Sequence, residues 1–270
     1  MSLGWDILII FLVSVIILCL DFKHPIHFIS TGYGASVLVQ SIVIILLHIT
    51  DLFKGGKYFS AILVIVHAIL IVFYGYRLAS FLYKRSKNEN YQATLKPFTL
   101  SPALSVIILV TCSALYLFMV SPLLQHALLV GNGVSACQII GMIVMICGLY
   151  IEALADHQKS EAKKINPKEF CSSGLYKYLR MPNYFGELVF WFGNYITSWF
   201  VNQHWYFIAF NLIGFLCIGF IMFHSASRLD IKQRQRYGTN PKFIEYRKTT
   251  RILIPLIPLY EINIVKDTEA

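Results

Sequence analysis

Charged residues are scarce in this sequence of 270 residues. Asp, Glu, Lys and Arg make up only 14% of the chain, whereas soluble domains carry about 25%. Hydrophobic residues make up 57%, and the mean hydropathy is +0.62. Acidic residues are the scarcest charged type, with 14 Asp and Glu against 23 Lys and Arg, so the formal net charge is +9. This composition excludes an ordinary soluble domain, and no long stretch has the low hydrophobicity and high charge of a disordered tail.

Metal-binding and disulfide patterns are also missing. The six cysteines lie mostly inside apolar stretches, and none of them forms a CxxC pair or a Cys/His ligand spacing. We therefore expect no metal site and no disulfide framework, and we expect the cysteines to pack as small apolar residues. The sequence has no internal repeat or inverted symmetry between its halves, which disfavours a transporter.

Long apolar runs are what the sequence has in abundance. Spanning a bilayer takes about 20 largely apolar residues in a helix, and such runs are too long and continuous for the alternating strands of a barrel. The sequence therefore predicts an all-α fold, a multi-pass membrane bundle of about seven helices. The predicted spans lie near residues 3–21, 27–50, 58–82, 100–123, 133–155, 183–201 and 204–224. The first run lacks a basic start and a cleavage site, so we read it as a retained helix.

The basic residues are distributed very unevenly between the two sides of these spans. Connections on one side carry 21 of the 23 Lys and Arg, and the other side carries only Lys54 and Lys57. The positive-inside rule then places the N-terminus outside and the C-terminal tail in the cytoplasm. This topology explains the +9 charge through contact with anionic membrane lipids, with no need for nucleic acid as a partner. The expected location is an integral membrane protein, of the cell membrane in a bacterium or of the endoplasmic reticulum in a eukaryote.

Acidic and basic side chains follow one another at the end of the fifth predicted span. Glu152, Asp156, Lys159 and Lys163 are spaced i, i+4, i+7 and i+11, which puts them in one stripe of a helix. Two acids at i, i+4 repel each other unless a cation or ligand lies between them. One interpretation is a solvated face of a helix that leaves the membrane. The other is a stripe that faces a ligand, and the depth of Glu152 favours it.

The loop before the sixth predicted span has the features of an anion site. Pro182 suits the start of a helix and Asn183 can cap one. A helix N-terminus beside Arg180 is a natural place for an anion. Asn183, Glu187 and Asn194 recur on one face of that span (i, i+4, i+11). The alternative is that Asn183 is only a cap and Glu187 only an interfacial acid.

The third predicted span carries polar groups at helical spacing. His67, Tyr74 and Arg77 follow at i, i+7 and i+10, although Arg77 can equally reach the membrane surface and Tyr74 can be an ordinary interfacial aromatic. After the seventh span, Arg228 opens a charged stretch that we expect to continue the helix to about Gly238. Together, the cytoplasmic pieces predict a site for a large polyanionic cofactor.

Four segments resemble the steroid 5-alpha-reductase-like membrane family. Residues 173–187, SGLYKYLRMPNYFGE, are similar to its signature GLWRYSRHPNYFGE. Residues 152–159 resemble its E-x-x-A-D-x-Q-K pattern, and residues 245–255 resemble its ending EYRRRTSxFIP. Arg77-Leu78 resembles its G-x-RL pattern. The resemblance covers about residues 70–258 and is best after residue 147.

The resemblance implies a seven-helix fold that holds NADPH between its C-terminal helices and reduces a carbon–carbon double bond conjugated to a ketone in a lipid-like substrate. By position, it implies that Tyr74 polarises the substrate carbonyl. Residues 1–99 would then form the substrate side and residues 100–270 the cofactor region. Together with the residue patterns above, it predicts these cofactor-binding residues: Arg77, Glu152, Asp156, Lys163, Arg180, Asn183, Tyr184, Glu187 and Arg228.

Two other functions remain open from the sequence. Related prenylcysteine and phospholipid methyltransferases share an Arg-His-Pro-x-Tyr core and use S-adenosylmethionine. Here Met181 stands at the His position, which favours the reductase branch. The third possibility is a membrane binding protein without enzymatic activity.

Overall fold

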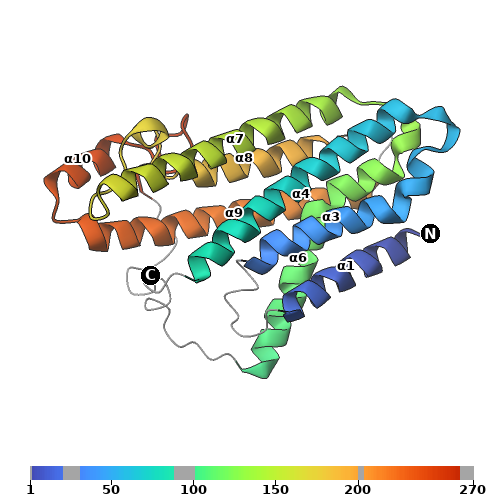
Figure 1. The fold of residues 1–270 in the computed structure, drawn as a ribbon, viewed down its shortest axis with the longest axis horizontal. Coiled ribbons are helices and arrows are strands. Elements are labelled where there is room, and N and C mark those ends of the chain that lie inside the picture. Colours follow the sequence, from blue (N-terminus) through green and yellow to red (C-terminus); the bar gives the residue numbers. More distant parts are fainter. Residues whose placement is uncertain (1, 21–30, 88–100, 200–203, 262–270) are drawn as a thin grey trace. The chain divides into compact units, whose positions relative to one another are not determined.

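All regular structure in the described part of the chain is helical (Figure 1). The computed structural model describes residues 2–20, 31–87, 101–199 and 204–261, and no β-strand occurs within these ranges. The helices are α1 (Leu3–Leu20), α3 (Thr31–Leu52), α4 (Tyr58–Ser86), α6 (Pro102–Leu128), α7 (Ala136–Ile165), α8 (Pro182–Ile196), α9 (Trp205–Tyr237) and α10 (Pro241–Thr249), with short 3₁₀ turns at Lys54–Gly56, Val130–Asn132 and Gly174–Lys177. The predicted all-α fold class is confirmed.

Six of the described helices are long and apolar enough to cross a membrane: α1, α3, α4, α6, α7 and α9. The predicted run 183–201 corresponds to α8, which has 15 residues and therefore rises about 22 Å, less than the about 30 Å of a bilayer core. Predicted span residues 21, 27–30, 100 and 200–201 lie outside the described residues. The multi-pass membrane bundle is confirmed. Helix α9 ends at Tyr237, beside Gly238 as predicted.

The chain forms two compact units. Unit 1 contains residues 1–142 and 194–215, and unit 2 contains residues 143–193 and 216–270. The chain passes between the units within α7, α8 and α9. These units are defined by packing, whereas the division after residue 99 concerns the roles of the two parts and stays a prediction.

Unit 1 is built around α3, which packs against α1, α4 and α6. Helices α3 and α4 approach most closely at two glycines. A Cβ on Gly34 would lie 2.8 Å from the carbonyl oxygen of Gly75, and a Cβ on Gly75 would lie 2.6 Å from the carbonyl oxygen of Gly34. Small residues allow membrane helices this close contact, and the crossing fixes the position of the residues beside each glycine.

Unit 2 contains a second glycine crossing, between α7 and α8. A Cβ on Gly148 would lie 2.7 Å from the carbonyl oxygen of Gly186, and a Cβ on Gly186 would lie 2.6 Å from the backbone nitrogen of Glu152. No larger residue fits at either position unless the backbones separate. The crossing therefore sets the register between the end of α7 and the start of α8.

The C-terminal segment of unit 2 packs beside the start of α8. The backbone N–H groups of Arg180 and Met181 donate to the carbonyl oxygens of Arg251 and Ile252, at 2.8 and 3.0 Å. Met181 and Ile252 also belong to a buried apolar cluster with Ala226 and Leu253. This packing holds the residues that lead into α8 against α9 and against the segment that follows α10.

Candidate functional site

Two buried acids flank the α7–α8 crossing in unit 2. The backbone of Glu152 lies against Gly186, and Glu187 follows Gly186 in the chain. The two side chains are only 4% and 6% exposed. Asn183 lies one turn before Glu187 on α8 and is half-buried, as is Asp156 one turn after Glu152 on α7. The structure thus brings four of the predicted site residues to the two helices that meet at one crossing.

Gln158 holds the loop that leads into α8. Its side-chain oxygen accepts a hydrogen bond from the backbone N–H of Leu175 at 2.8 Å. Gly174 beside it has φ +61°, a conformation that glycine adopts without strain, and a Cβ at this position would lie 2.5 Å from the side-chain Cδ of Gln158. Tyr246 donates to the carbonyl oxygen of Tyr176 at 2.6 Å. Gln158 lies in the D-x-Q-K motif, but sequence reasoning assigned it no role.

Lys163 is engaged by the chain segment that follows α7. Its ammonium group donates to the carbonyl oxygens of Pro167, at 3.3 Å, and Glu169, and to the hydroxyl of Tyr237 at 2.8 Å. An ammonium group has three donors, so these contacts use all of them. In the structure this predicted cofactor residue connects the end of α7 to the end of α9 by hydrogen bonds.

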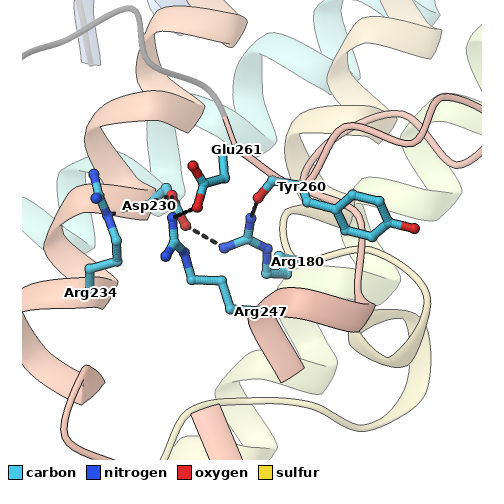
Figure 2. Close-up of polar contacts among 6 residues, drawn as sticks. All are labelled: Arg180, Asp230, Arg234, Arg247, Tyr260 and Glu261. Carbon is cyan, nitrogen blue, oxygen red and sulfur yellow. Dashed lines mark hydrogen bonds and ion pairs between the residues drawn. The ribbon is translucent and has the colours of Figure 1, made fainter. Parts of the chain in front are cut away.

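Arg180 belongs to a charge cluster that is centred on Asp230 (Figure 2). Its guanidinium pairs with Asp230 and donates to the carbonyl oxygen of Tyr260, and the paired side chains are 0% and 2% exposed. Asp230 also lies 3.5 Å from Arg247 and 3.8 Å from Arg234. Arg247 in turn pairs with Glu261 at 2.8 Å. Sequence reasoning placed an anion beside Arg180, whereas in the structure this guanidinium binds groups of its own chain.

Burial of Arg180 has a direct electrostatic consequence. It lowers the pKa of the guanidinium, and the neighbouring carboxylate of Asp230 partly offsets that shift. Arginine nevertheless remains protonated in proteins, so Arg180 and Asp230 form a buried ion pair. Their pairing fixes the segment between residues 174 and 182 and hence the start of α8.

Tyr184 and Arg228 differ in their surroundings. Tyr184 is half-buried on the first turn of α8, where its ring packs against the cluster of Met181 and Leu253. Arg228 lies on α9 and is exposed. Asn183 and Tyr184 both lie in the first turn of α8, the end of a helix that favours negative charge.

Tyr74 occupies the interior of unit 1. It is fully buried, and its hydroxyl lies 2.9 Å from the hydroxyl of Tyr33. Tyr33 is stacked on Tyr116 with ring centroids 5.3 Å apart and planes 22° apart. Arg77 follows one turn later on α4 and is half-buried. Sequence reasoning gave Tyr33 no role, because the contact joins residues 41 positions apart.

Asn194 connects helices within unit 1. Its amide nitrogen donates to the carbonyl oxygen of Met119 at 2.9 Å, and its side-chain oxygen accepts from Nε2 of His67 at 2.8 Å. Nδ1 of His67 lies 3.3 Å from Nδ1 of His126. Asn194 was predicted on the same face of α8 as Asn183 and Glu187, and the structure uses its amide to attach the end of α8 to α4 and α6.

The fold and the motifs define a multi-pass membrane protein of the steroid 5-alpha-reductase-like kind. More specifically, the chain belongs to the family described as "Protein of unknown function (DUF1295)", whose model matches residues 28–250. The resemblance predicted from the four segments is confirmed.

Several curated proteins are similar to part of the chain. The 3-oxo-5-alpha-steroid 4-dehydrogenase 1 of Rattus norvegicus is 28% identical over 123 residues, which cover 45% of this chain and 42% of that protein. The same-named protein of Mus musculus is 30% identical over 123 residues (45% and 43%). Steroid 5-alpha-reductase DET2 of Arabidopsis thaliana is 27% identical over 122 residues (44% and 41%). The matches thus span about two fifths of these relatives, and no solved structure matches the chain.

Proposed function

We propose that the chain is a membrane-embedded, NADPH-dependent reductase of a carbon–carbon double bond conjugated to a ketone in a steroid-like or other lipid substrate. The names of the relatives support this reaction class. The observation that carries the proposal is the α7–α8 crossing of unit 2, where Glu152 and Glu187 are buried beside Gly186. Carboxylates accept hydrogen bonds from hydroxyl groups, so acids grouped at this crossing suit a ligand rich in hydroxyl groups.

The residues of unit 2 fit a dinucleotide cofactor. Ionised carboxylates only accept hydrogen bonds, so Glu152, Asp156 and Glu187 match the donors of ribose hydroxyls and a carboxamide. The N-terminal end of α8, where Asn183 and Tyr184 lie, matches a phosphate, because a helix N-terminus favours negative charge. When bound, NADPH supplies a hydride.

The basic residues act in two ways in this proposal. Arg228, which is exposed on α9, and Arg77 add positive charge for the phosphates. Lys163 and Arg180 act as positioning residues, since their donors hold the segments on either side of the site. In this proposal residues 100–270 contain most of the cofactor site and residues 1–99 form the substrate side, although Arg77 of that part is assigned to the cofactor.

Tyr74 is the proposed catalytic residue. Hydride addition to the β-carbon of an enone develops negative charge on the carbonyl oxygen, and a hydrogen bond from the Tyr74 hydroxyl stabilises that charge. The residue is fully buried, and a surrounding of low polarity strengthens such a bond. The site therefore stabilises the transition state more than the bound ketone.

Ligand-dependent thermal unfolding of the purified full chain tests the choice of cofactor. NADPH at about 100 times its dissociation constant should add about 2.7 kcal/mol of stability. Asn183→Ala and Glu187→Ala should reduce that stabilisation, because they remove acceptors at the α7–α8 crossing. Glu161→Gln is the matched control, since this acid of α7 is 47% exposed and pairs with the neighbouring Lys164.

The outcomes separate the three functions. Stabilisation by S-adenosylmethionine with none by NADPH contradicts the reductase and indicates a methyltransferase. Absence of stabilisation by either ligand favours a membrane protein without enzymatic activity.

A further inference from the structure

We infer that Tyr33 is a second residue of the reaction site, which positions and polarises the Tyr74 hydroxyl through the bond between the two phenol groups. This inference rests on the proposed reductase function and on the 2.9 Å distance between the two hydroxyl oxygens. The inference gives a function to a residue that lies outside the four segments that resemble the family.

The backbone of unit 1 fixes the tyrosine pair. Tyr33 directly precedes Gly34, and Tyr74 directly precedes Gly75, the two glycines where α3 and α4 touch. Because this contact is backbone to backbone, neither helix can rotate or slide without steric overlap. Tyr116 belongs to a third helix, α6, and its ring stacks on the ring of Tyr33 and fixes the orientation of that ring. The hydroxyl pair is thus held by three helices.

The direction of the hydrogen bond follows from counting protons. Each phenol has one O–H group. When Tyr74 donates its proton to a substrate oxygen, its own oxygen can only accept from Tyr33. The resulting order is Tyr33 to Tyr74 to substrate, and each bond in such a chain strengthens the next. Tyr33 keeps its proton throughout, and no covalent bond to Tyr33 forms or breaks.

Both side chains lie inside unit 1, and this burial strengthens the hydrogen bond between them. Tyr74 is fully buried and Tyr33 is 6% exposed. Negative charge that develops on the Tyr74 oxygen is therefore stabilised by the Tyr33 hydroxyl and not by bulk water. A hydrogen bond to a charged group of this kind corresponds to about a 10- to 100-fold effect on a rate.

The test combines steady-state kinetics with a double-mutant cycle. Testosterone, a 3-oxo-4-ene steroid, serves as the probe, and NADPH oxidation by the detergent-solubilised full chain is measured. Tyr33→Phe keeps the ring that stacks on Tyr116 and removes only the hydroxyl. We expect kcat to fall about 10- to 100-fold with KM and NADPH-dependent thermal stabilisation unchanged. Tyr76→Phe is the matched control, because this tyrosine lies on the same helix and is 63% exposed.

The cycle distinguishes positioning from packing. If Tyr33 acts through Tyr74, adding Tyr33→Phe to Tyr74→Phe lowers kcat no further. Equal losses in both backgrounds, or an unchanged kcat in Tyr33→Phe, contradict the inference while the wild-type reductase stands. If the wild-type chain does not oxidise NADPH with the probe, this inference is overturned; if it also fails to bind NADPH, the proposed function falls as well.

Discussion

Replacing Asp230 by Asn should destabilise the protein more than any other conservative change in the charge cluster of Figure 2. The paired side chains of Arg180 and Asp230 are 0% and 2% exposed, so the substitution leaves a buried guanidinium without its counter-charge. Breaking a buried ion pair in this way costs about 3–5 kcal/mol. For a chain of this size that corresponds to a fall in Tm of about 6–20 °C.

The same cluster supplies the control. Arg247 and Glu261 are 21% and 58% exposed, and exposed ion pairs contribute about 0–1 kcal/mol. Glu261→Gln should therefore lower Tm by no more than about 4 °C. Both variants are compared by thermal unfolding of the full chain in the same detergent.

A second variant separates charge from packing. The double change Arg180→Met and Asp230→Leu removes both charges, and should recover much of the stability lost in Asp230→Asn. If Asp230→Asn and Glu261→Gln have equal effects, the assignment of Arg180 and Asp230 as a buried pair that positions the start of α8 is wrong.

Three further results are expected. Gly186→Ala should lower the free energy of unfolding by about 1–3 kcal/mol and weaken NADPH-dependent stabilisation, because the new Cβ would lie 2.6 Å from the backbone nitrogen of Glu152. Gly219→Ala on α9 is the control: a Cβ there meets open space, so this variant should be neutral or slightly stabilising. Burial raises the pKa of Tyr246, so the contribution of this shift to stability is complete below pH about 10, the pKa of an unfolded tyrosine. The contribution falls as the pH rises further. The free energy of unfolding of Tyr246→Phe should therefore decrease less above pH about 10 than that of the wild type. Tyr74→Phe should lower the turnover of NADPH with a 3-oxo-4-ene steroid while leaving NADPH-dependent stabilisation intact, and unchanged turnover would exclude Tyr74 as the proton donor.

The long helices could be predicted from the sequence because hydropathy over about 20 residues is a local property. The end of α9 beside Gly238 could be predicted because a glycine commonly follows the last residues of a helix, which is also a local signal. The length of α8 could not, because its apolar run continues past the residue where the helix ends at Ile196. A hydropathy pattern does not distinguish a helix that crosses the membrane from a shorter one that ends inside an apolar sequence.

The candidate site was only partly predictable. Glu152 and Glu187 were recognisable because acids are rare and costly inside a membrane span. The partner of Arg180 was not, because Asp230 lies 50 residues away and the chain between them must fold first. Tyr33 had no local signal, since it is one of 16 tyrosines and only the glycine crossing of α3 and α4 brings it to Tyr74.

The most direct test of the reductase proposal follows the transferred hydrogen. The purified full chain is incubated with testosterone and NADPH that carries deuterium at the hydride position, and the product is analysed by mass spectrometry and NMR. The proposal predicts a product with two added hydrogens, of which one is deuterium on the carbon β to the ketone. Absence of the label from the steroid, in protein that is stabilised by S-adenosylmethionine and not by NADPH, would contradict it.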